Sequence, residues 1–133
     1  MDKRIIEKKE GKCMKNVVEN MEKYLEQRKA EVLEESLKLA ADGRVDESNF
    51  LKARANIYDV FKALLGASFK IAGNDRDAFI ADFKKRTETV PAAWKKSLEA
   101  ALKYGDDKKI LIEKAKLSAA DEIAAKFEEL MRQ

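Results

Sequence analysis

The amino-acid sequence predicts an all-α fold, an antiparallel helical bundle of about five helices, in which two long helices are followed by two short ones and a long one. Apolar side chains recur at helical spacing along most of the chain. One proline and five glycines among 133 residues are too few for the many turns of a β-rich fold. The clearest apolar stripe repeats every seven residues and alternates large with small or branched side chains: Phe50, Ala53, Ile57, Val60, Leu64, Ala67 and Ile71.

The first long helix is expected over residues 14–41. Its apolar face has heptad-like spacing and consists of Val18, Met21, Leu25, Val32 and Leu39. Arg28 falls on this stripe, whereas Tyr24 and Leu37 lie off it, so the helix is broadly amphipathic. Such a helix can contact more than one neighbour.

Glycines and capping side chains predict the helix boundaries. Gly43, Gly73 and Gly105 can each adopt the left-handed conformation that ends a helix. Pro91 disfavours helix at Val90 and suits the first turn of a new helix. The expected N-caps are, in chain order, Asp46 or Ser48, Asp75 or Asp77, and Asp106 or Asp107.

The remaining helices also carry apolar faces. The end of the second helix, residues 64–72, is almost wholly apolar or small, which places it at the centre of the bundle. The third helix is expected to turn Phe79, Ile80 and Phe83 inward, and the fourth Trp94, Leu98, Ala101 and Leu102. The last helix presents Leu111, Ala115, Ala119, Ile123, Phe127 and Leu130.

Residues 1–13 are mostly charged and precede the first sustained apolar pattern, which starts at Met14. Gly11 is expected to interrupt any helix here. Two interpretations stay open. Lysine and arginine outnumber the acidic side chains, which fits a basic leading arm. Alternatively, Glu10-Gly11 can be encoded by GAAGGA, which resembles a bacterial ribosome-binding site, so that translation starts at Met14. Under both interpretations residues 14–133 form a single helical-bundle domain.

Charge and cysteine content exclude several classes of protein. The chain has 28 basic and 25 acidic side chains, and a net charge of +3 is a weak basis for any polyanionic partner. Cys13 is the only cysteine, so there is no intrachain disulfide framework and a reducing compartment is the simplest setting. No apolar run approaches the roughly 20 residues that span a bilayer. We expect a cytoplasmic protein without a membrane segment.

The sequence contains no recognisable catalytic, cofactor or metal motif. Histidine is absent, which removes the commonest general base and metal ligand. An all-carboxylate magnesium site needs Glu-x-x-Glu facing Glu-x-x-Asp, as in helical nucleotide pyrophosphohydrolases. The first spacing occurs in Glu7/Glu10, Glu19/Glu22 and Glu31/Glu34, but the second does not occur. We therefore expect no catalytic residues, cofactor or metal, and a magnesium-dependent nucleotide hydrolase is only a second alternative.

Five basic side chains around Pro91 are candidate nucleic-acid contacts: Lys84, Lys85, Arg86, Lys95 and Lys96. Only Glu88 opposes them within segment 84–96. Trp94 lies inside this segment, but it aligns with the apolar face of its own helix.

Asn56 and Tyr58 lie beside the central stripe, where a polar group can fix helix register. The aromatic side chains Phe61, Phe69, Phe79 and Phe83 are expected to form core, with a hydrophobic-ligand cavity as the alternative.

The leading functional hypothesis is a non-enzymatic protein-association module, pairing with itself as a homodimer or with another protein. The first helix is much longer than the third and fourth, and two-fold dimers are the commonest soluble assembly. The alternative is a nucleic-acid-associated accessory protein that uses segment 84–96 and the leading arm.

Overall fold

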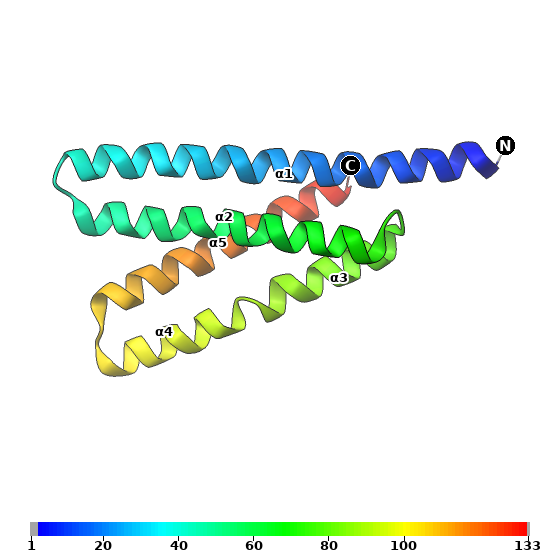
Figure 1. Ribbon diagram of the computed structural model, residues 1–133. Coiled ribbons are helices and arrows are strands. Elements are labelled where there is room, and N and C mark those ends of the chain that lie inside the picture. Colours follow the sequence, from blue (N-terminus) through cyan, green and yellow to red (C-terminus); the bar gives the residue numbers. More distant parts are fainter. Residues whose placement is uncertain (1–2, 133) are drawn as a thin grey trace.

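The computed structural model describes residues 3–132, with side chains from Met14 onward. Throughout this part the chain is helical or in short turns, without strands, so the all-α prediction is confirmed. None of its helices is long and apolar enough to cross a membrane. The elements are α1 (Lys3–Ala41), α2 (Val45–Ala72), α3 (Arg76–Thr89), α4 (Ala92–Tyr104) and α5 (Asp107–Arg132) (Figure 1).

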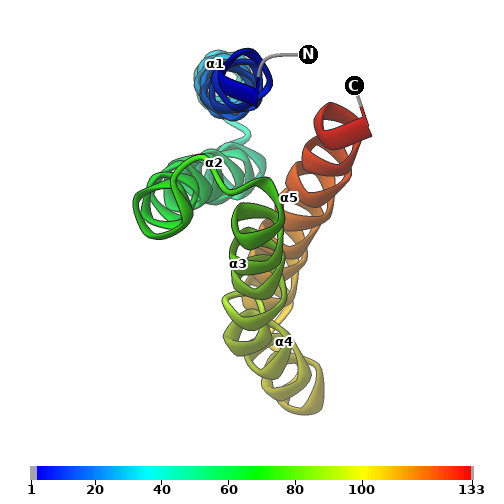
Figure 2. The ribbon, with the colours of Figure 1, turned by 90° about the vertical axis from the view of Figure 1, so that its right-hand side faces the viewer.

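The arrangement differs from a set of five antiparallel neighbours, because α3 and α4 run in the same direction. α1 and α2 form an antiparallel hairpin, the α3–α4 pair runs back, and α5 returns across both (Figures 1 and 2). Val90 and Pro91, which separate α3 from α4, both have right-handed helical backbone angles. The proline interrupts the hydrogen-bond ladder without reversing the chain. Pro91 therefore separates α3 from α4, and the two helices continue in the same direction instead of forming a hairpin.

α1 begins earlier than the sequence suggested. The helix starts at Lys3 and continues through Gly11, so the expected interruption there is wrong. An interior glycine costs only about 1 kcal/mol relative to alanine, which a long helix tolerates. α1 has 39 residues against 28 in α2, and its first turns extend beyond the rest of the molecule (Figure 1). The side chains of the proposed leading arm, including Cys13, lie outside the described residues.

The expected face of α1 is confirmed, whereas the seam of α2 is shifted. Val18, Met21, Leu25 and Val32 are buried, and Leu39 is half-buried. On α2 the fully buried line passes through Tyr58, Phe61 and Leu65, while Leu64 is only partly buried and Ile71 is 68% exposed. A straight helix drifts by about 20° per heptad against a seven-residue repeat, so the stripe rotates by about 40° between Ile57 and Ile71. Ile71 also lies in the last turn of α2. The end of α2 is therefore not the bundle centre.

The turns follow the predicted chemistry with one exception. Gly43, Gly73 and Gly105 have positive φ, as expected at helix ends. Asp75 caps α3 and Asp106 caps α5, each through a side-chain oxygen that accepts from a backbone N–H. Neither Asp46 nor Ser48 caps α2, because the helix already starts at Val45. The Ser48 hydroxyl instead donates to the Ser36 carbonyl oxygen at 2.8 Å, joining the two helices of the hairpin.

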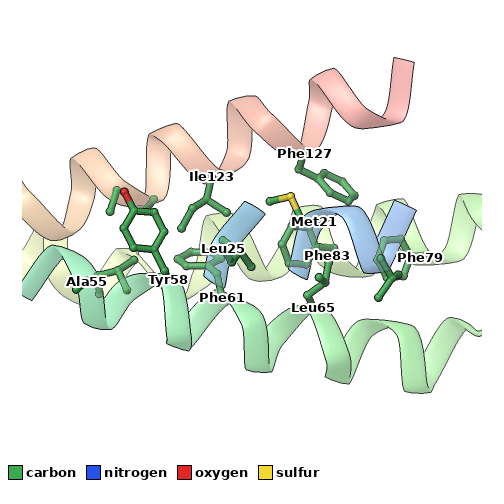
Figure 3. Packing of buried hydrophobic residues seen from close by; sticks show 14 of the residues in the cluster. Met21, Leu25, Ala55, Tyr58, Phe61, Leu65, Phe79, Phe83, Ile123 and Phe127 are labelled. Carbon is green, nitrogen blue, oxygen red and sulfur yellow. The ribbon is translucent and has the colours of Figure 1, made fainter. Parts of the chain in front are cut away.

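Aromatic side chains form the centre of the core. Phe83 of α3 contacts Phe127 of α5 with ring centroids 4.5 Å apart, and Phe79 stacks beside Phe83 at 6.2 Å. Phe61 of α2 meets Phe83 edge to face at 6.5 Å. Figure 3 shows these rings converging with Leu65 and Met21 between the helices. The predicted aromatic set is therefore core, which α4 joins only at its edge through the partly buried Trp94.

We predict that Leu65→Ala destabilises the protein by about 3 kcal/mol, because it leaves a cavity at a fully buried site. Leu64→Ala is the matched control and is expected to cost markedly less, since Leu64 is partly exposed. Urea unfolding of both variants measures the difference. An equal or larger loss at Leu64 would show that the seven-residue stripe, rather than the Tyr58–Leu65 line, is the true seam.

Candidate functional site

One carboxylate joins three helices. Glu122 of α5 accepts hydrogen bonds from the Tyr24 hydroxyl and from Arg28, both on α1. Arg28 Nε lies 3.1 Å from Glu122 Oε2, and its Nη2 lies 3.2 Å from Oε1. From α2, Arg54 Nη2 donates to Oε1 at 2.6 Å and the Tyr58 hydroxyl donates at 2.9 Å. Tyr58 points from α2 toward α5 (Figure 3), so the Glu122 cluster ties α5 to both helices of the first hairpin.

The environment of the cluster fixes its protonation. Burial raises the pKa of the Glu122 carboxyl, but hydrogen bonds from the two arginines and the two tyrosines favour its charged form more strongly and lower the pKa to about 2. The pKa values of Tyr24 and Tyr58 are raised, first by burial and then by their hydrogen bonds to this carboxylate. At neutral pH the cluster therefore holds one carboxylate, two guanidinium groups and two neutral phenols.

The protonation and hydrogen bonding of the Glu122 cluster fit a structural contact between helices better than a catalytic centre. A general base needs a pKa near the working pH and free access to a proton, and Glu122 has neither. Both of its oxygens already accept hydrogen bonds from protein donors. The two phenols stay protonated at any ordinary pH, so they cannot act as bases. The Glu122 cluster holds α5 in register against α1 and α2.

Sequence reasoning found only part of this cluster. Arg28 was visible because it interrupts an apolar stripe, and Tyr58 because it lies beside the central seam. Asn56, noted with Tyr58, is exposed and takes no part. The sequence pattern does not distinguish Glu122 or Arg54, because each is one charged residue among many on a helix with a charged outer face. Only the crossing of α5 over the first hairpin brings them together.

The basic segment 84–96 is divided between different environments. Arg86 is held by Asp82, with its Nε 2.7 Å from the carboxylate oxygen, and this contact holds the pKa of Asp82 below its usual range. Trp94 is half-buried and meets Phe61 edge to face at 6.3 Å, so its ring is part of the core margin. The remaining members are exposed: Lys84, Lys85, Lys95 and Lys96.

Two of these lysines line a groove of about 550 Å³ between α3 and α5. Its apolar lining includes Ile80, Phe127 and Met131. The charged lining is balanced, with Lys84, Lys95 and Arg132 accompanied by Glu88, Asp121 and Glu128. A phosphate backbone would meet as many carboxylates as cations here, so the groove itself is not built to attract a polyanion.

Of the paired glutamates of α1, Glu31 and Glu34 form surface ion pairs, whereas Glu19 and Glu22 form none with the described residues. Glu31 contacts Arg28 at 2.8 Å and Glu34 contacts Lys38 at 3.7 Å. Glu7 and Glu10 lie outside the described side chains. In the part of the chain that the structure describes, no three acidic or thiol side chains come together in a group that could hold a metal ion. The arrangement thus offers no support for the magnesium-dependent hydrolase.

A second buried carboxylate, Glu113 of α5, is only half satisfied. One of its oxygens accepts from Lys116 at 3.2 Å, whereas the other has no hydrogen-bond partner. Its one cationic partner comes from the next turn of its own helix. Among the described residues, Lys116 is therefore the only side chain that donates a hydrogen bond to Glu113.

Large apolar side chains are exposed mainly at one end of the molecule. This turn end carries the α1–α2 turn (residues 42–44) and the α4–α5 turn (residues 105–106) (Figure 1). Lys108 and Asp46, 3.7 Å apart, link the two turns. Six large hydrophobic side chains are exposed among the described residues, and only Ile71 lies at the opposite end. The five at the turn end are Leu37, Val45, Leu102, Tyr104 and Leu111.

The prediction that Leu102 and Leu111 lie on inward faces is wrong. They are 55% and 47% exposed, respectively. The fourth helix buries only Ala101 fully, because it lies at the edge of the bundle, farthest from α1, and packs mainly against α5 (Figure 2). An edge helix has one covered side, so part of a broad apolar face stays exposed.

Comparison with protein-family models, with curated protein sequences and with solved structures gave no match.

We predict that Glu122→Gln lowers the free energy of unfolding at pH 7 by roughly 2 kcal/mol, since the two arginines lose their shared counter-charge at a partly exposed site. The pKa of Glu122 is about 2 in the folded state, against an ordinary value of 4.5. Its contribution to stability is therefore complete above about pH 5 and is lost as the pH falls toward 2.

Thermal unfolding of the parent and of Glu122→Gln between pH 7 and pH 2.5 measures this contribution. The two stability curves are expected to converge as the pH falls. A constant gap over the whole range would contradict the assigned ionisation. Glu128→Gln, at an exposed site on the same helix, controls for general charge effects.

Proposed function

We propose that this chain is a non-enzymatic association module that pairs with a second copy of itself. The observation that carries the proposal is the gathering of five exposed large hydrophobic side chains at the turn end. Single exposed hydrophobic residues are normal on a monomer, whereas several of them gathered at one end of the molecule favour an interaction site there. The interior clusters have structural roles, so they supply no competing activity.

A second candidate, nucleic-acid association, is supported by the four exposed lysines on either side of Pro91. Lys85 and Lys96 lie outside the charge-balanced groove, and four such cations could contact a phosphate backbone. Binding of a DNA or RNA oligonucleotide that weakens steeply with salt, and that is lost on Lys85→Glu with Lys96→Glu, would support this candidate. Without salt-sensitive binding by the parent protein, the candidate fails.

We expect light scattering coupled to size exclusion to show a dimer, for protein made from Met1 and also for protein made from Met14. Both should dimerise, because residues 1–13 lie at the end of α1 away from the turn end (Figure 1). The dimer should persist at high salt, since apolar contacts are not screened. A monomer at every concentration and salt level would refute self-association.

A further inference from the structure

We propose that the second copy docks on the hairpin tip, residues 102–111, in a two-fold contact that covers Leu102, Tyr104 and Leu111. This inference rests on the proposed self-association and names the surface responsible for it. The tip consists of the last turn of α4, the turn at Gly105 and the first turns of α5. Its three large apolar side chains are 55%, 79% and 47% exposed.

The position of α4 explains why the tip is uncovered. α4 has α5 as its principal neighbour and contacts α3 only lightly, where the two helices meet. Near its C-terminus, Ala101 is buried while Leu102 and Tyr104 face outward. Among the described residues, no helix other than α5 and α3 makes more than a weak contact with α4, so the outer side of the α4–α5 hairpin is uncovered. A partner that covers it would remove apolar surface from water without rearranging the fold.

The charges of the tip favour a second copy of the chain over a nucleic acid or an acidic surface. Across the turn the sequence reads Lys103-Tyr104-Gly105-Asp106-Asp107-Lys108-Lys109, in which two acids are enclosed by three lysines. With both signs interspersed, the turn offers a polyanion little net attraction. A two-fold contact is self-complementary, so an acid of one copy can meet a base of the other, and each such pair forms twice.

Two of the charged groups remain available for pairing across the contact. The Asp106 carboxylate is engaged in capping α5, Lys108 pairs with Asp46, and Lys103 lies over the Tyr104 ring at 5.7 Å. Asp107 and Lys109 form no ion pair with any other described residue. These two side chains are therefore the polar partners that the two-fold contact offers.

The neighbouring turn enlarges the surface. The contact between Lys108 and Asp46 holds the start of α2 beside the start of α5, and Val45, the first residue of α2, is 57% exposed. Val45 therefore lies at the same end of the molecule as the hairpin tip and can add apolar area to the contact. A stable dimer typically buries about 800 Å² per partner, which needs more than one short hairpin.

The test compares Leu102→Lys with Ile71→Lys. Both replace an exposed large aliphatic side chain in the last turn of a helix, where a lysine is favourable for the helix, but at opposite ends of the molecule. Leu102→Lys should raise the dimer dissociation constant by about 100-fold or more, because the loss occurs twice per dimer. Ile71→Lys should change it by about threefold at most. Sedimentation equilibrium measures the constants, and circular dichroism verifies the fold of each monomer.

A charge exchange tests the register of the contact. Asp107→Lys and Lys109→Asp should each weaken the dimer, and the double variant should recover most of the lost affinity, because the pairs reform with reversed signs. A monomeric parent protein would refute the proposed self-association itself. A dimeric parent whose dissociation constant responds to Ile71→Lys but not to Leu102→Lys would leave self-association intact and overturn the hairpin tip as its surface.

Discussion

The carboxylate of Glu122 determines how α5 lies across the first hairpin. Hydrogen-bond donors offset the cost of partly burying a charge, and here the donors come from both α1 and α2. A shift of α5 by one turn would separate the carboxylate from Arg28 and Arg54 together. The apolar contacts of Ile123 and Phe127 are less directional, so they supply much of the attraction while the Glu122 cluster sets the register.

The exposed turn end follows from the way the chain returns. Because Pro91 interrupts the helix without reversing the chain, α4 continues past the aromatic core to the edge of the bundle. α5 packs against both α4 and α2, and its second half carries the buried Ala119, Ile123 and Phe127. Within residues 3–132, no other helix covers the outer side of the α4–α5 hairpin. The same break that organises the core therefore leaves Leu102 and Leu111 in contact with solvent.

Charge on this protein is mostly neutralised locally. Acidic and basic side chains alternate along the helices and pair across them, as Lys62 with Glu26 and Lys29 with Asp59. The groove between α3 and α5 is balanced in the same way. Such surfaces give little long-range attraction for a polyanion, but they let identical surfaces approach without strong repulsion. This supports self-association as the proposed function, with nucleic-acid association as the second candidate.

The sequence by itself determined the all-α class, the positions of most helix ends and the buried face of α1, because these depend on local periodicity, glycines and capping side chains. Its predictions were wrong at Gly11, at the N-cap of α2 and at the α2 seam, where a seven-residue pattern does not show which neighbour each residue meets. Tertiary structure alone decided that Glu122 meets Arg54 and that Leu102 is exposed. Both depend on where α5 crosses α2 and on which side of α4 is left uncovered, and these are properties of packing between segments distant in the chain.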